Sequence, residues 1–440
     1  MKAMQGVFRW YLRQNLLLRI LTGLVGGAVV GLMVGPSVAA IRPLGTLFVR
    51  LLKMIVMPLI LFTLIGGAAS VSPARLGRIG VKILGFYMLT SAFAVAVGLL
   101  AANLFRPGVG MEIAGGAEVA RELARPDITE TLLGVIPTNV FEALSSGAVL
   151  PVIFFAIVFG IALSYLRIAP NETVSAAADT LLQVVEAGAQ VMYTIVAGIM
   201  QYAPIGVFAL ISVVFGQQGA AAFGPLATVT AAFYSAAVVH VAVVLVAALL
   251  LARIPVGRFF SGAREAIVTA FVTRSSSGTL PVTMKAAEER LGIRRSIFSF
   301  TLPLGATINM DGSAIYQGVC AMFIAFAIGM PLDVGQQVTV ILTAVLASIG
   351  SAGVPGAGAI MLLMVLNSVG LPVSEGSPAA LAYALILGID ALLDMGRTAL
   401  NVTGDLVGTA VVARSEGEMD LAILSGDTSA DEQTPLASNQ

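Results

Sequence analysis

Apolar residues in this chain run in long stretches instead of the short alternations of a soluble protein. A helix needs about 20 mostly apolar residues to cross a bilayer, and eight stretches meet or approach that length. They are Ile20–Ile41, Met54–Ser72, Ile83–Phe105, Val149–Leu166, Ala187–Gly216, Pro225–Ala252, Ser296–Met322 and Ala379–Ala413. We therefore predict an all-α integral membrane protein with eight transmembrane helices. The first stretch is longer than a signal-peptide core, so we interpret it as a retained helix.

Two further apolar stretches are interrupted by polar residues, glycine and proline. The first is Ala266–Met284, broken around Arg274–Pro281, and the second is Val334–Ser374, broken around Gly350–Gly358. Non-helical backbone is tolerated at membrane depth only where it is buried in protein or lines a cavity. Paired interrupted segments are typical of transporter binding sites. We predict two re-entrant helical hairpins, with two kinked spanning helices as the alternative.

Basic residues predict the orientation, because Lys and Arg are enriched in cytoplasmic loops. Arg9 and Arg13 precede the first stretch, and Arg75 and Arg78 follow the second. Further basic residues follow the sixth stretch and the first hairpin. Eight spans and two non-crossing hairpins place all of these on one side. We expect a multi-pass protein of the inner (plasma) membrane, in contact with its lipids and with both termini cytoplasmic.

Composition narrows the class of protein. The chain of 440 residues is 58% hydrophobic and 11% charged, and its formal net charge is zero. This excludes an ordinary soluble protein and gives no overall basic surface for nucleic acid. A single cysteine, Cys320, excludes an intrachain disulfide. The single histidine, His240, lies in the sixth stretch, and we interpret it as a packing or interface residue over a proton relay.

Five polar residues in the last stretch form the strongest functional signal. Asp390, Asp394, Arg397, Asn401 and Asp405 are spaced 4, 3, 4 and 4 residues apart. At about 100° per residue they fall within about 80° of one helix face. Ionisable groups at membrane depth are costly and mark functional sites by default. We predict a binding site for charged ligands, with structural ion pairs between helices as the alternative.

The seventh stretch carries a second polar group, Asn309-Met310-Asp311-Gly312-Ser313. A glycine beside an amide, a carboxylate and a hydroxyl indicates an unwound turn. Unwinding frees backbone carbonyls, and these together with the carboxylate suit a small hard cation. The motif therefore predicts a cation site beside the charged stripe.

Three functional classes compete for these features. An aspartyl intramembrane protease usually has Gly-x-Gly-Asp, whereas Val402-Thr403-Gly404 precedes Asp405. A cation channel is opposed by an arginine on the acidic face. No nucleotide fingerprint is present, so we expect neither an enzyme nor an ATP-driven pump.

A charge count favours a coupled carrier. Four aspartates and two arginines carry a net charge of −2, and a bound acidic amino acid would bring the net charge to −3. About three monovalent cations would therefore neutralise the set. The groups counted are Asp311, Asp390, Asp394, Asp405, Arg274 and Arg397.

These motifs resemble those of the dicarboxylate/amino acid:cation symporter family, which includes excitatory amino acid transporters and archaeal aspartate homologues. The resemblance runs from about Leu16 to Arg414. It rests on Arg-Ser-Ser-Ser-Gly-Thr-Leu-Pro, Asn-Met-Asp-Gly-Ser, Gly-Val-Pro-Gly-Ala-Gly and Asp-Met-Gly-Arg-Thr-Ala-Leu-Asn-Val-Thr-Gly-Asp.

The resemblance implies a glutamate-transporter-like elevator fold and a homotrimer. Residues 1–80 and 131–216 would form a scaffold of spans 1, 2, 4 and 5. Residues 81–105 (span 3) and 217–413 (spans 6 to 8 with both hairpins) would form a transport domain, with the second hairpin as outer gate. Residues 106–130 would be an external loop. Residues 414–440 lie beyond the resemblance, and their acidic composition, rich in Ser, Thr, Asp and Gln, predicts a disordered cytoplasmic tail.

The resemblance also implies residue roles toward the substrate. Arg397 would pair with its side-chain carboxylate, Asp394 would accept its ammonium group, and Asn401 would hold its α-carboxylate. Ser313 stands where relatives usually carry Thr. The remaining implied substrate residues are Ser276, Thr398, Val354, Gly358 and Arg274.

Three sodium sites are implied in the same way. The first comprises Asp405, Asn309, Asn401 and the Gly305 carbonyl. The second comprises Met310 with the backbones of Thr307, Ser348, Ile349 and Ser351. The third comprises Tyr87, Thr90, Ser91, Asn309 and Asp311.

The expected activity is sodium-coupled symport of L-aspartate or L-glutamate, with about three sodium ions per substrate and no organic cofactor. Gln317 stands where the proton-coupled animal branch has Glu, which favours sodium. Asp394 favours an amino acid over a C4-dicarboxylate, and Arg397 disfavours neutral amino acids. A proton-coupled glutamate or C4-dicarboxylate symporter is the alternative, and an ion channel is the alternative from another class.

Overall fold

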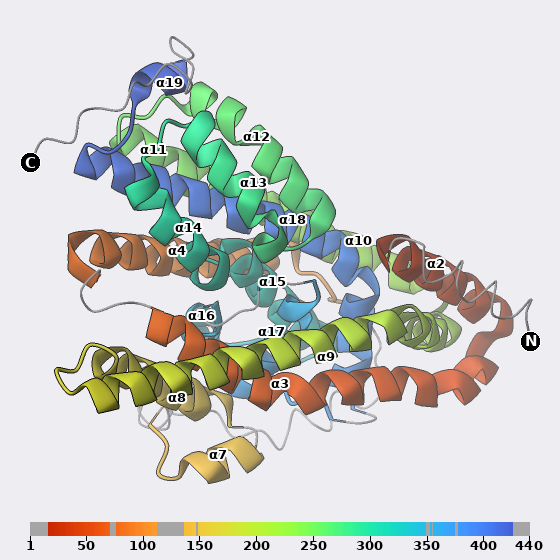
Figure 1. Cartoon of the computed structure of the whole chain (residues 1–440). Coiled ribbons are helices and arrows are strands. Elements are labelled where there is room, and N and C mark those ends of the chain that lie inside the picture. Colours follow the sequence, from red (N-terminus) through yellow and green to blue (C-terminus); the bar gives the residue numbers. More distant parts are fainter. Residues whose placement is uncertain are drawn as a thin grey trace, which may run out of the picture.

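The computed structural model describes residues 16–70, 76–111, 136–146, 148–348, 353, 355–374 and 377–425. In these ranges the regular structure is helical, apart from one isolated bridge between Ile293 and Met419 (Figure 1). This confirms the predicted all-α class.

The described part of the first half of the chain contains both long and short helices. They are α2 (Leu16–Val34), η1 (Gly35–Ile41), α3 (Arg42–Ser70), η2 (Leu76–Gly80), α4 (Val81–Phe105), α7 (Val140–Ser146), α8 (Val149–Leu166) and α9 (Glu172–Gln218). The second half contains shorter pieces and one long helix. They are η3 (Gly219–Ala222), α10 (Phe223–Val239), η4 (His240–Leu245), α11 (Val246–Leu251), α12 (Val256–Thr273), α13 (Ser276–Glu289), α14 (Arg295–Ile308), α15 (Asp311–Ala327), α16 (Val334–Ser348), α17 (Ala357–Ser368), α18 (Pro378–Glu416) and α19 (Leu421–Ser425).

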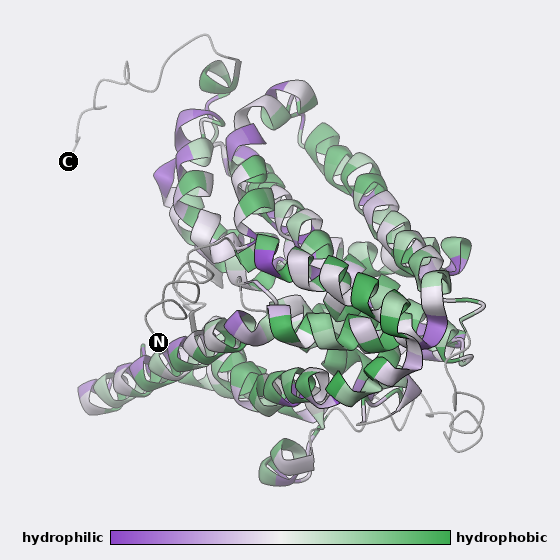
Figure 2. Cartoon of the chain, turned by 90° about the vertical axis from the view of Figure 1, so that its right-hand side faces the viewer, coloured by the Kyte–Doolittle hydropathy of each residue, from purple (hydrophilic) through white to green (hydrophobic). Residues whose placement is uncertain are grey.

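Several helical runs are suited to a membrane by length and composition. Among the described residues, five are long and apolar enough to cross one: Leu18–Ala69, Arg78–Phe105, Glu172–Leu251, Arg295–Ala327 and Pro378–Glu416. Figure 2 shows hydrophobic residues along most of the helices. Two of these runs join segments that the hydrophobic pattern separated, since α2 continues into α3 and α9 continues to α11. The structure thus supports a membrane protein, and the count of eight spans stays a prediction.

The first interrupted stretch folds as a helical hairpin, longer than predicted. Helices α12 and α13 pack side by side and are joined at Arg274 and Ser275 (Figure 1). Arg274 adopts a left-handed conformation with φ of 55°, and the Ser275 hydroxyl accepts a hydrogen bond from Gly278 N. The predicted range began at Ala266, whereas α12 begins at Val256. The hydrophobic pattern missed the first turns of α12 because they are amphipathic and not uniformly apolar. Helix α13 has 14 residues, too few to cross a bilayer alone.

The second interrupted stretch also contains two short helices, α16 with 15 residues and α17 with 12, which contact each other. Most of the connection between them, 349–352 and 354, lies outside the described residues. Gly356 precedes α17 with φ of 83°, a conformation that glycine adopts easily.

The seventh predicted span is broken, as its polar motif indicated, but over fewer residues. Helix α14 ends at Ile308 and α15 begins at Asp311, so that only Asn309 and Met310 leave the helix. Gly312 and Ser313 were expected in the unwound turn but belong to the first turn of α15. Their N–H groups are capped by the Asn401 side-chain oxygen at 2.8 and 3.4 Å, which allows the helix to begin early.

Contacts divide the helices into two groups. Helix α9 packs along α2 and α3, and α3 packs on α8. Helix α15 lies among α4, α10, α16, α17 and α18. The groups meet chiefly where α18 contacts α9 and α2, and where α17 contacts α3 and α8 (Figure 1).

The contact within the first group is very close. Gly23, Gly27 and Gly31 face the backbone of α9, and a Cβ at each would lie 2.5 to 2.6 Å from a carbonyl oxygen of α9. Such stripes of small residues let membrane helices approach closely.

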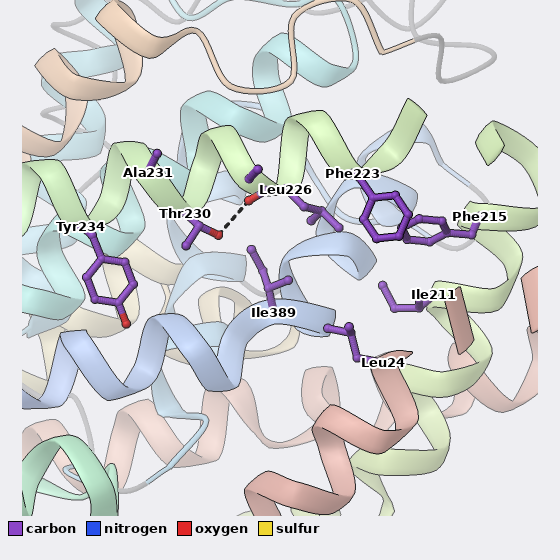
Figure 3. A pocket seen from close by; sticks show the side chains of 10 residues that line it. Leu24, Ile211, Phe215, Phe223, Leu226, Thr230, Ala231, Tyr234 and Ile389 are labelled. Carbon is purple, nitrogen blue, oxygen red and sulfur yellow. Dashed lines mark hydrogen bonds between the residues drawn. The ribbon is translucent and has the colours of Figure 1, made fainter. Parts of the chain in front are cut away.

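Beside the contact between the groups, α2, α9, α10 and α18 line an open apolar pocket of about 490 Å³ (Figure 3). Leu24 and Ile389 face it from opposite groups. The hydroxyl groups of Thr230 and Tyr234 in its wall are bonded to the Leu226 and Leu392 carbonyls at 2.7 and 2.6 Å.

The segment after α18 differs from the predicted tail. Glu416 forms ion pairs with Arg78 at 3.0 Å and Lys82 at 2.5 Å. The chain then pairs with the loop after α13, where Asp420 N donates to Gly292 O at 2.7 Å. Residues 414–440 were expected to lack structure, but 414–416 belong to α18 and 417–425 are held by these backbone bonds. Residues 426–440 lie outside the described residues.

Candidate functional site

The stripe on α18 is buried along its whole length. Asp394, Arg397 and Asp405 are each 2% exposed, Asn401 is 3% and Asp390 is 7%. Helix α18 lies against α15, α14 and α12, so the stripe faces the broken span and the first hairpin. The sequence prediction that these five side chains share one buried face is confirmed by their contacts, which fall into two clusters.

The first cluster is centred on Arg397. Its Nη2 lies 2.6 Å from Asp394 Oδ1, its Nε lies 3.2 Å from the same oxygen, and its Nη1 lies 3.6 Å from Asp390 Oδ1. The guanidinium also lies 4.7 Å from the centre of the Tyr316 ring. One cation thus sits between two carboxylates and an aromatic face in a water-poor setting, where such contacts are strong.

Asp394 has further donors that fix its position. Thr398 Oγ1 donates to Asp394 Oδ1 at 3.2 Å, and Gly356 N donates to Oδ2 at 3.4 Å. The contact of Gly356 joins the second hairpin, just before α17, to α18. Thr398 and Asp394 were both predicted site residues, whereas Gly356 and Tyr316 were not.

The two hairpins meet over this cluster. Ser275 Oγ and Ser277 N both donate to Gly353 O, at 2.7 and 3.2 Å. Gly358 lies so close to Arg397 that a Cβ there would overlap Nη1. The hairpin tips therefore form a cover over the guanidinium.

A narrow cavity lies beneath this cover. Its volume is about 10 Å³, room for about one water molecule. Its walls come from both hairpins, the broken span and α18: Arg274, Ser276, Met310, Ser313, Gly353, Ala357, Gly358, Asp394, Arg397, Thr398 and Asn401. Eight of the nine predicted substrate residues line it, and the ninth, Val354, lies outside the described residues.

The second cluster lies where α14 and α15 separate. Asn309 Nδ2 donates to Asp405 Oδ1 at 3.0 Å and to the Asn401 carbonyl at 3.3 Å. A Cβ at Gly305 would lie 2.6 Å from both Asp405 Oδ1 and the Tyr87 hydroxyl. The structure thus brings together the residues of the first predicted sodium site.

Helix α4 contributes the third predicted set. Ser91 Oγ and Thr90 Oγ1 donate to Asp311 Oδ1 at 2.8 and 3.2 Å, and Thr90 Oγ1 lies 3.5 Å from Asn309 Oδ1. The Tyr87 hydroxyl donates to the Thr301 carbonyl at 3.1 Å, so in this geometry it does not bond to Asp311. Carboxylate, amide and hydroxyl oxygens are the ligands that hard cations prefer, so both sets fit sodium.

The second predicted sodium set is only partly described. Met310 Sδ accepts from Asn401 Nδ2 at 3.0 Å, while the Thr307 and Ser348 hydroxyls bond to carbonyls of their own helices. Ile349 and Ser351 lie outside the described residues. The backbone ligands expected here stay a prediction.

The sequence interpretation missed a polar contact of His240. Its Nε2 lies 3.2 Å from Asp311 Oδ2, and both side chains are fully buried. The two residues are 71 positions apart in the sequence. The interpretation considered only acidic residues near His240 in sequence, so it missed this contact. His240 is therefore not a simple packing residue.

Comparison with known proteins agrees with a carrier for acidic substrates. The all-helical fold, the apolar spans and the buried charges define a membrane transporter. The chain belongs to the sodium:dicarboxylate symporter family, whose sequence model matches residues 16–415. This confirms the family resemblance.

Relatives of this chain carry several names. It is 35% identical over 412 residues to a proton/sodium-glutamate symport protein of Bacillus caldotenax, covering 91% of this chain and 94% of the relative. It is 35% identical to a proton/glutamate-aspartate symporter of Escherichia coli (strain K12), covering 86% of each. It is 33% identical to a C4-dicarboxylate transport protein of Leptothrix cholodnii, covering 92% of this chain and 90% of the relative.

Proposed function

We propose that this protein imports L-aspartate or L-glutamate in symport with sodium ions. One observation carries the substrate class: Asp394 and Arg397, both buried, meet in the narrow cavity. An acidic amino acid offers a cation for Asp394 and a second carboxylate for Arg397. A C4-dicarboxylate offers no partner for Asp394.

Substrate entry would exchange one ion pair for two. The substrate ammonium would replace Arg397 beside Asp394, and the freed guanidinium would turn to the side-chain carboxylate. A guanidinium fork suits a carboxylate because two parallel hydrogen bonds can form. The cavity is too small for this exchange, so the hairpin cover must move. We propose that the second hairpin is the gate and that Val354 N, with Asn401 and Ser276, holds the α-carboxylate.

Sodium ions would supply the missing positive charge. Asp311 and Asp405 are surrounded by neutral donors, so cations would neutralise them as the acidic substrate enters. We propose about three ions per substrate, in the three sets named above, with the set at Ile349 and Ser351 completed when the second hairpin closes.

We further propose that transport follows an elevator mechanism in a homotrimer. The first group of helices would be the scaffold and the second the moving domain, with the predicted boundaries at 80, 105, 130, 216 and 413. The close α2–α9 contact and the apolar pocket between the two groups support this division (Figure 3). The expected location is the inner (plasma) membrane, with both termini cytoplasmic.

Radiolabelled L-aspartate uptake into proteoliposomes tests the proposal. A sodium gradient and a proton gradient are imposed separately, with unlabelled glutamate and succinate as competitors. We expect accumulation with the sodium gradient and competition by glutamate. Accumulation driven only by protons would overturn the sodium assignment, and a stronger effect of succinate would favour the C4-dicarboxylate alternative. A channel would equilibrate the label without concentrating it.

A further inference from the structure

We propose that His240 is a positioning residue for a cation site: it holds the Asp311 carboxylate so that one oxygen faces the cation. The inference rests on the proposed function, because it assigns a partner to one of the proposed sodium ligands. It adds a residue from the sixth predicted span to a site otherwise built from α4 and the broken seventh span.

The local backbone brings His240 to this position. It is the first residue of the π-helix η4, which interrupts the helical run between α10 and α11. The wider π turn is rare and is found frequently at functional sites. This turn contacts α4 and α18, the helices that carry the other ligands. The π turn thus directs the imidazole of His240 from a mostly apolar span into the interior of the protein.

The two oxygens of Asp311 have separate partners. Oδ1 accepts from Ser91 and Thr90, whereas Oδ2 contacts His240 at 3.2 Å. Thr90 Oγ1 in turn lies 3.5 Å from Asn309 Oδ1, so Oδ1 is the oxygen that shares its partners with the proposed cation set. His240 therefore anchors Oδ2 and leaves Oδ1, beside the hydroxyl groups of Ser91 and Thr90, to the cation.

The other imidazole nitrogen indicates which atom donates. Nδ1 is buried and has no hydrogen-bond partner within the described residues. A hydrogen on Nδ1 would be a buried donor without an acceptor, and Nε2 would then present a lone pair to a carboxylate. A hydrogen on Nε2 avoids both problems, so the ring acts as a donor to Asp311.

Packing alone does not explain a histidine here. Burying a polar ring costs free energy unless it is hydrogen-bonded, and an apolar residue of similar volume would fill the same space. The bond to Asp311 is the one contact that compensates this burial among the residues described. Removing it would leave Oδ2 without a donor and free the carboxylate to rotate.

A pair of amide variants tests the role. The amide nitrogen of His240→Gln can reach the position of Nε2, while the shorter side chain of His240→Asn ends near Nδ1 and cannot reach Asp311. The measurement is the sodium concentration for half-maximal L-aspartate binding, together with aspartate affinity at saturating sodium and the melting temperature without sodium. Val243→Ala, an exposed position on the same turn, is the matched control.

We expect His240→Asn to raise the half-maximal sodium concentration about tenfold or more, the loss of one hydrogen bond to a charged group. His240→Gln and Val243→Ala should stay within about threefold of the wild type, and all should bind aspartate similarly at saturating sodium. In an Asp311→Asn background, His240→Asn should add no further shift, because the coupled partner is already altered.

Two results would overturn the inference while the proposed function stands. One is an unchanged sodium requirement in His240→Asn. The other is an equal loss of melting temperature and of aspartate affinity in both amide variants, which would indicate a purely structural role. A wild type that binds aspartate equally well without sodium would instead overturn the sodium assignment itself, and this role with it.

Discussion

The two clusters on the α18 stripe balance their charges in different ways. Around Arg397, the carboxylates of Asp390 and Asp394 have a buried guanidinium within 3.6 Å. Around Asn309, the carboxylates of Asp311 and Asp405 have amide, hydroxyl and imidazole groups as partners. The first cluster contains its own cation, and the second contains only dipoles among the described residues.

Under the proposed function, this difference would allow one site to take up ions of both signs. A buried charge that already has a partner of opposite sign can exchange that partner for a substrate group that carries the same charge as the partner. A buried carboxylate that has only neutral donors gains most from a cation, because desolvation is costly. The first cluster is therefore suited to an amino acid and the second to sodium. Substitutions that alter one cluster at a time should separate the two functions.

The largest effect should come from Arg397→Cys, which removes the guanidinium that pairs with Asp394 and Asp390. We expect aspartate binding to fall at least about 100-fold, because the group proposed to bind the side-chain carboxylate is lost and Asp394 loses its ion pair. Calorimetric titration with aspartate and with serine measures the change. Serine binding should appear or strengthen, since Asp394 can still accept an ammonium group. Arg397→Lys is the control for charge without the fork, and unchanged aspartate affinity in Arg397→Cys would contradict the assignment.

The next effect should come from Asp405→Asn, in the second cluster. The substitution keeps the size of the side chain and removes one negative charge from the Asn309 contact. We expect the sodium concentration for half-maximal uptake to rise about tenfold or more, since one hard ligand becomes neutral. Aspartate affinity at saturating sodium should change much less. An unaltered sodium response would remove Asp405 from the cation sites.

A smaller effect should come from Gly358→Ala, which tests the cover over the first cluster. The added Cβ would overlap Arg397 Nη1, so the guanidinium or the hairpin must shift. We expect aspartate affinity to fall roughly tenfold, the scale of one weakened charged hydrogen bond, with the sodium dependence retained. Gly224→Ala is the control, since a Cβ there meets no atom within 4 Å. Equal affinities in the two variants would show that the hairpin is not held against Arg397.

The smallest effect should come from Ser313→Thr, which adds one methyl group to the cavity wall. We expect aspartate affinity to change by no more than about threefold, because the hydroxyl is kept. The ratio of aspartate to glutamate affinity is the informative readout, since the two substrates differ by one methylene. A large loss of both would place Ser313 closer to the substrate than proposed.

The sequence predicted the stripe and the broken span well, because both depend on local patterns. Residues 3 or 4 positions apart on a helix share a face, so Asp394, Arg397 and Asn401 were placed together without knowledge of any other element. The break at Asn309 followed from a polar motif with glycine in an apolar span. Its extent was overestimated because the capping by Asn401 comes from a distant helix.

Contacts between distant segments were beyond the sequence pattern. His240 and Asp311 come from different spans, and nothing local to either residue marks their meeting. Tyr316 on the Arg397 guanidinium was missed for the same reason. The segment around Met419 was judged by its polar composition, but its backbone bonds to Gly292 and Arg294 depend on where α18 ends. The residues of the first and third cation sets were named through the family resemblance, and their role as cation ligands stays a prediction.

The glycine stripe of α2 has a mechanical consequence. With Gly23, Gly27 and Gly31 seated on carbonyl oxygens of α9, any axial slip of one helix would carry a Cα onto a backbone atom. The two helices therefore resist sliding along each other, and we expect them to move as one rigid body. On the side of the apolar pocket, Leu24 and Ile389 border open space instead of a facing backbone, so part of each side chain has no van der Waals partner there. Helix α2 thus meets a close-fitting backbone on one side and an open apolar space on the other.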